Sequence, residues 1–174
     1  HERLVGSEMC IRDKFTVTPF DGKMMRGFLS DIGNGTPGWI QFNAATPETF
    51  TVLREEPGLY ITGADWGKNV VYASGYTDDD RTESLFCLNP DTLEVQERIH
   101  TFMPTTDIVY SSVHDMILFA YKTYFGFIPL KEMTIEGSTY QAGTALYFDL
   151  AKLVGDDYIT GITDLPYGDC LLYT

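Results

Sequence analysis

The sequence predicts an all-β fold, and three observations support that prediction. The apolar runs are short and rich in Val, Ile, Thr, Tyr and Phe, which suit a pleated, half-buried strand. Gly, Pro, Asn and Asp bound most of these runs, as turns between strands require. Similar landmarks also recur at intervals of about 46 residues, which indicates an array of repeated β units.

The expected strands follow one another at short intervals along the chain. They are residues 38–43, 48–55, 69–76, 84–89, 115–128 and 145–150. Residues 146–154 have some helical character, but the glycines that flank them and their alternating apolar residues favour a strand.

One recurring landmark is an apolar strand that follows a turn. Gly22-Lys23 recurs 45 residues later as Gly67-Lys68, and Tyr72 is matched 47 residues later by Phe119. This spacing and the strands around it predict about four strands in each unit.

A second landmark is an apolar strand that ends in Asn or Asp and is followed by a turn and another strand. Asn43 and Asn89 end two such strands, 46 residues apart, and Asp149 ends the third after a further 60 residues. The longer interval predicts an insertion at about 122–144, and the segment after Asp149 is expected to be a strand.

Four strands in about 46 residues match one blade of a β-propeller. Residues 14–169 then form an incomplete propeller of about three four-stranded antiparallel blades, with units at about 20–66, 67–113 and 114–165. Three blades are fewer than a closed ring holds. The alternative is a β-sandwich, because sandwiches also space their strands regularly.

Residues 84–99, "SLFCLNPDTLEVQERI", resemble the "L-Y-x-I-D-x-x-T-G-x-x-x-x-I" hairpin of bacterial cell-surface propeller repeats, the broad quinoprotein-like or YncE-like class. The resemblance extends at blade level over most of 20–165. It implies a fragment of a secreted or surface protein whose partners include the missing blades of the parent chain. Leu93 departs from the pattern, because that position usually holds Gly.

The two ends of the chain resemble a translated sequencing adapter. Residues 170–174 can be encoded by a stretch whose reverse complement, shifted by one base, encodes residues 9–13. Residues 4–13 resemble the read-through of a transposase mosaic-end adapter, and residues 170–174 resemble its other strand. We therefore expect residues 1–13 and 170–174 to be non-biological and 14–169 to be a fragment of a longer, metagenomic reading frame.

The charge of the chain excludes some partners. The formal net charge is −13, and without residues 1–13 the acidic count falls from 25 to 22, the basic count from 12 to 10 and the net charge to −12. Such a surface repels nucleic acid and anionic lipid. No apolar stretch is long enough to span a membrane as a helix, so membrane insertion is not expected.

Aromatic residues are the candidate ligand-binding groups. The expected insertion is rich in them, and insertions on one face of a repeat array often form the binding face. Exposed rings can stack on sugars or anchor a protein, although the same rings can form the core between blades. The candidates are Trp66, Tyr121, Tyr124, Phe125, Phe127 and Tyr140.

The sequence shows no recognisable catalytic, metal or cofactor motif. His100 and His114 are not paired with a nearby Ser or Cys in a recognisable arrangement, and Cys87 lies in an apolar run that predicts burial. The acidic tract 77–80 lacks the alternating ligands of a calcium loop and is expected to be solvated. We expect no cofactor and no metal.

Three functions remain open at this point. The first is a non-catalytic binding or scaffold segment of a secreted or surface bacterial protein that contacts protein or glycan through its rim loops. The second is part of a propeller enzyme such as a glycoside hydrolase or lyase, for which Asp65 and Asp107 are candidates because both lie near innermost strands. The third is a structural spacer in an adhesin.

Overall fold

The computed structural model describes residues 16–164 and 170–173, apart from 68, 102, 106, 156 and 160. For residues 16–21, 163–164 and 170–173, only the backbone is described. The described residues form an all-β fold, as the sequence predicts. Residues 1–13, for which the sequence suggests an adapter origin, lie outside this part of the chain.

Three four-stranded antiparallel sheets make up most of the fold. Neighbouring strands of each sheet are also consecutive in the chain, except that a hairpin is inserted before the last strand of the third sheet. The first sheet contains β1 (Thr16–Asp21), β2 (Met24–Leu29), β3 (Gly38–Asn43) and β4 (Thr46–Glu55). The second contains β5 (Leu59–Trp66), β6 (Val71–Thr77), β7 (Ser84–Leu88) and β8 (Val95–His100). The third contains β9 (Asp107–Ser111), β10 (Met116–Tyr121), β11 (Tyr124–Pro129) and β14 (Leu146–Asp149).

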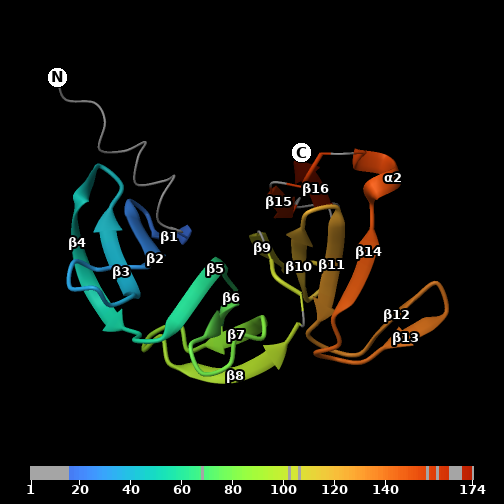
Figure 1. The fold of residues 1–174 in the computed structure, drawn as a ribbon, viewed down its shortest axis with the longest axis horizontal. Helices are drawn as coiled ribbons and strands as arrows, with labels where there is room; N and C mark the ends of the chain where they lie inside the picture. The colour runs from blue at the N-terminus through green and yellow to red at the C-terminus, as the bar shows by residue number, and fades with distance from the viewer. Residues whose placement is uncertain are drawn as a thin grey trace.

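The sheets follow one another across the molecule, as Figure 1 shows. Their first strands lie in contact, because β1 contacts β5 and β5 contacts β9. Strand β9 in turn contacts β15 (Gly161–Asp164), which forms a two-stranded sheet with β16 (Cys170–Tyr173). Each sheet therefore packs against the next along its first strand.

Apolar clusters fill the space between successive sheets. Between the first and second sheets, Trp39 is fully buried and packs edge to face against Phe28, with ring centroids 5.1 Å apart. Between the second and third sheets the cluster includes Tyr72, whose ring stacks on Tyr110 at 5.3 Å. Burial of aromatic and aliphatic side chains on both faces of the middle sheet holds the series together.

Tyr72 and Phe119, which the sequence comparison matched at an interval of 47 residues, do not occupy equivalent positions. Both belong to the cluster between the second and third sheets, so they face each other across it. Because successive residues of a strand point to opposite faces, a shift of one residue in the match is enough to cause this difference.

The match of Asp149 to Asn43 and Asn89 is also wrong. Asn43 ends β3, and Asn89 directly follows β7, and both of these are third strands, whereas Asp149 ends β14, the fourth strand of its sheet. The third strand of that sheet is β11, which the sequence analysis merged with β10 into one run. The segment after Asp149 is not a strand but begins with one turn of helix, α2 (Ala151–Val154).

The insertion is shorter than expected. Its first part belongs to β11, and the extra residues form the hairpin of β12 (Met133–Ile135) and β13 (Ser138–Tyr140) between β11 and β14. Figure 1 shows this hairpin extending from the body of the molecule beside β14.

The turn that holds Leu93 keeps the backbone conformation that a glycine would favour. Leu93 has a φ of +59°, and its N–H donates to the carbonyl of Asn89 at 2.8 Å. Its side chain is 1% exposed and joins the cluster between the first two sheets. Burial of the leucine therefore offsets a backbone conformation that is unfavourable for a residue with a Cβ.

In the part of the chain that the structure describes, no helix is long and apolar enough to cross a membrane, since α2 has four residues.

Candidate functional site: a cleft on the second sheet

The aromatic residues singled out from the sequence do not form one surface. Trp66 packs against Trp39 with ring centroids 6.0 Å apart, in the cluster between the first two sheets. The other five lie on or beside the third sheet.

Phe127 is 7% exposed and contacts Tyr140 edge to face, with centroids 6.1 Å apart, so it anchors the β12–β13 hairpin to the sheet. Phe125 is half-buried and packs against the apolar cluster of the third sheet. Tyr121 and Tyr124 are half-buried partners at the end of the β10–β11 pair, and the Lys122 ammonium lies 5.1 Å from the centroid of the Tyr121 ring. Phe127 is thus buried in packing, whereas the other four rings remain partly exposed.

Asp65 and Asp107 connect neighbouring sheets through the backbone. Asp65 accepts the N–H of Tyr110 at 2.7 Å and that of Trp66 at 2.8 Å. Asp107 accepts the N–H of Ile162 at 3.2 Å and that of Ile108 at 2.9 Å. Both oxygens of each carboxylate accept a backbone hydrogen bond, and one of the two bonds reaches the neighbouring sheet, so each carboxylate joins its own strand to that sheet.

A serine–histidine pair is present that the sequence analysis did not find. Ser84 and His100 lie opposite each other on β7 and β8, with Oγ and Nδ1 3.3 Å apart. Ser84 is fully buried, and its hydroxyl also donates to the carbonyl of Thr82 and accepts from Arg98. A hydroxyl that is buried and already shared in this way cannot attack a substrate, so the pair is structural.

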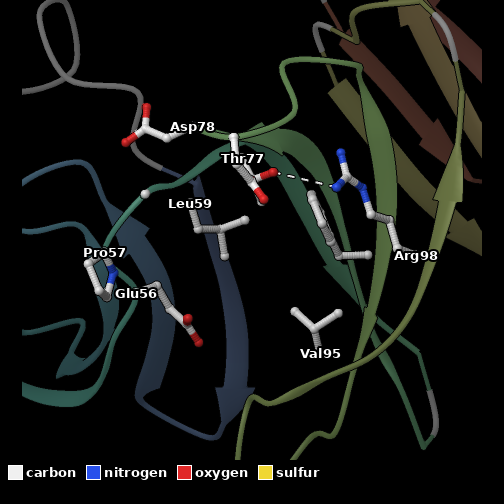
Figure 2. A pocket seen from close by; sticks show the side chains of 10 residues that line it. Glu56, Pro57, Leu59, Thr77, Asp78, Val95 and Arg98 are labelled. Atoms are coloured by element: carbon white, nitrogen blue, oxygen red, sulfur yellow. Dashed lines mark hydrogen bonds between the residues drawn. The ribbon is translucent and has the colours of Figure 1, made fainter.

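The described residues form a cleft of about 700 Å³ on the second sheet. Its walls come from the β4–β5 connection, the end of β6 and strands β5, β7 and β8. Figure 2 shows Glu56 on one side and Arg98 on the other, with Leu59 and Val95 between them. The lining residues are Glu56, Pro57, Gly58, Leu59, Thr77, Asp78, Asp79, Phe86, Val95 and Arg98.

Arg98 organises one wall of the cleft. Its Nε donates to Ser84 at 2.9 Å, and its Nη2 donates to the carbonyls of Asp80 and Thr82 at 3.2 Å. The same nitrogen lies 3.1 Å from the carboxylate of Asp80. The guanidinium thereby fixes the loop after β6, in which sequence reasoning expected a solvated acidic tract.

The acidic tract is ordered by hydrogen bonds within the loop. The hydroxyl of Thr77 holds the pKa of Asp79 below its ordinary value, and the hydroxyl of Thr82 does the same for the pKa of Asp80. Negative charge at Asp78 raises the pKa of the Tyr60 hydroxyl nearby. Among the described residues no group of three acidic, His or Cys side chains is placed to hold a metal ion.

A second, smaller hollow of about 300 Å³ lies between the second sheet and the residues that follow β13. Cys87 and Tyr72 line it, and burial raises the pKa of Cys87 to about 11 and that of Tyr72 to about 12. The thiol is therefore protonated at neutral pH and unreactive. This agrees with the expectation that Cys87 is a small buried apolar residue.

Comparison of the chain with protein families and with curated proteins finds no match.

Proposed function

We propose that the chain is a non-catalytic binding segment of a secreted or cell-surface bacterial protein, and that its three sheets are consecutive blades of an incomplete β-propeller. The observation that supports the blade assignment is the serial packing of three meanders through their first strands. A sandwich buries the inner faces of two sheets against each other, whereas here the middle sheet buries both of its faces. Placement in a surface protein rests on the resemblance of residues 84–99 to surface propeller repeats.

The contact surface in this proposal is the cleft. Connections in a meander alternate between the two ends of a sheet, so the β4–β5 connection and the β6–β7 loop lie at the same end of their sheets. Loops gathered at one end of a rigid scaffold commonly carry binding function. The cleft between these loops combines apolar area at Val95, which is 45% exposed, with charged side chains around it. Apolar area with a few polar groups around it is typical of ligand-binding sites.

Binding is favoured over catalysis because the candidate catalytic groups are already engaged. Asp65 and Asp107 bind backbone N–H groups, and Ser84 is buried. A glycosidase needs two carboxyl groups that face a common space on either side of a sugar. Asp65 and Asp107 instead each accept a backbone hydrogen bond from the neighbouring sheet.

Arrays of glycans and of extracellular proteins, probed with the purified chain, test this proposal. The variant Val95→Trp fills the cleft, and the matched control Val113→Trp places the same ring at a position that is 53% exposed and outside the cleft. We expect the unchanged chain and Val113→Trp to bind the same partner, and Val95→Trp to lose it. Absence of any partner for the unchanged chain, or equal binding by both variants, would refute the proposal.

A further inference from the structure

The cleft has an apolar zone and an acidic rim. Leu59, Phe86 and Val95 supply the apolar zone, and of these Val95 is the most exposed. Glu56, Asp78 and Asp79 supply three carboxylates, and Arg98 is the one basic side chain among the residues that line the cleft. The formal charge of the lining is therefore negative. Just outside the lining, Arg54 pairs with Glu56, and Arg81 lies 3.8 Å from the carboxylate of Asp78.

Arg98 is not available to an anionic ligand. Its donors are occupied by Ser84, by two backbone carbonyls and by the Asp80 carboxylate. Its guanidinium also lies over the ring of Phe86, 5.4 Å from the centroid. Because Glu56 and Asp78 each have an arginine partner, the negative charge that the cleft presents to a ligand comes chiefly from Asp79. The raised pKa of Tyr60 beside Asp78 is consistent with a negative potential at this rim.

A sugar ring fits the cleft less well than an aliphatic chain does. Sugars bind by stacking on exposed aromatic faces, but Phe86, the aromatic residue in the lining, is 2% exposed and partly covered by Arg98. The exposed apolar surface is instead the branched side chain of Val95. A flexible methylene stem can lie against such a surface while its polar end reaches water.

We infer that the cleft accepts a Lys or Arg side chain from an extended segment of a partner protein. The aliphatic stem packs against Val95, and the cationic head lies among the carboxylates of the rim (Figure 2). This inference rests on the proposed binding function and specifies the chemistry of its ligand. The net charge of −13 also favours a basic partner over an acidic one, since opposite charges speed encounter.

The test uses two short peptides and the backbone amide signals of the ¹⁵N-labelled chain. The probes are acetyl-Gly-Arg-Gly-amide and acetyl-Gly-citrulline-Gly-amide, which differ in charge and hardly in shape. We expect the arginine peptide to shift the amides of Gly58, Asp78 and Val95 in a saturable way, and the citrulline peptide to bind at least about fivefold more weakly. Raising the salt to about 1 M should weaken arginine binding, because screening there acts within about 3 Å.

Two variant chains locate the charge effect. Asp78→Asn with Asp79→Asn removes two rim carboxylates and keeps their hydrogen-bonding size, and we expect about fivefold weaker arginine binding. Glu48→Gln with Glu136→Gln removes the same charge from exposed sites outside the cleft and should leave the affinity unchanged within about twofold. Equal losses in both pairs would mean that net charge, not the cleft, attracts the peptide.

The remaining outcomes separate the ligand class from the binding function. Equal shifts from the arginine and citrulline peptides, or shifts confined to amides outside the cleft, overturn the inference. If maltohexaose moves the cleft amides and the arginine peptide does not, the ligand class is wrong while a binding role stands. If the arginine peptide binds as expected but the arrays show no partner, the cleft chemistry stands and the proposed function fails.

Discussion

Leu93 offers a sharp test of the balance between backbone conformation and burial. The residue combines a φ of +59° with a side chain that is 1% exposed. A left-handed backbone costs a residue with a Cβ about 1–2 kcal/mol. Truncation of a buried leucine to alanine costs about 2–5 kcal/mol. Leu93→Ala loses the packing and keeps the unfavourable φ, whereas Leu93→Gly loses the packing and regains the backbone energy.

We therefore expect both variants to be less stable than the unchanged chain, and Leu93→Gly to be more stable than Leu93→Ala by about 1 kcal/mol. Urea unfolding followed by tryptophan fluorescence measures the difference as a shift in midpoint at constant slope. In an ordinary strand the order is reversed, because glycine costs about 0.5–1 kcal/mol relative to alanine. An alanine variant as stable as the glycine variant, or more stable, would refute the assignment of this turn.

Three further predictions concern the packing of the sheets. Asp65→Ala should lower the free energy of unfolding by about 1–3 kcal/mol, because the N–H groups of Tyr110 and Trp66 lose their acceptor. Asp65→Asn keeps an acceptor oxygen and should lower the free energy of unfolding by less. The midpoints of urea unfolding compare the two variants. Burial raises the pKa of Asp107, so the folded state binds the proton more tightly than the unfolded state does. The contribution of Asp107 to stability should therefore fall as the pH rises from the unfolded pKa of about 3.9 through the folded pKa. The difference in free energy of unfolding between the unchanged chain and Asp107→Asn, measured at several pH values, should show this decline. Gly126→Ala should lower the free energy of unfolding by about 1–3 kcal/mol or more, because the new Cβ would lie 2.3 Å from the ring of Phe119 and 2.5 Å from the carbonyl oxygen of Leu146. The control Gly63→Ala should cost less in the same unfolding assay, because its nearest contacts are 3.2 Å and 3.3 Å away.

The sequence predicted the strand content and the positions of several strands because alternation and turn residues are local signals. Residues 38–43 were predicted as a strand and form β3 with the same bounds. The boundary between β10 and β11 was missed because the turn there contains neither Gly nor Asn. Lys122 takes the left-handed conformation instead, with a φ of +54°, and no local signal in the sequence marks it. The error then propagated, because Asp149 was matched to a third strand when β11 already filled that place.

The cleft could not be predicted from the sequence because its walls come from segments that are far apart in the chain. Glu56 comes just before the first strand of the second sheet, Arg98 lies in its last strand, and neither belongs to a recognisable motif. The acidic tract at 77–80 is visible in the sequence, but its link to Arg98 depends on the pairing of β7 with β8, which brings Phe86 opposite Arg98. Only the register of those strands places the guanidinium beside the loop.

The register also explains why the acidic loop can be part of a binding surface at all. A run of carboxylates in a mobile loop would lose conformational entropy on binding, which weakens affinity. Here Arg98 holds the loop at Asp80, and the Thr77 and Thr82 hydroxyls hold it at Asp79 and Asp80. Ordering of the loop is thus achieved by folding, before any ligand arrives. Substitution of Arg98 by Ala would therefore weaken arginine-peptide binding even though it removes a positive charge from the cleft, an outcome opposite to the one that simple electrostatics predicts.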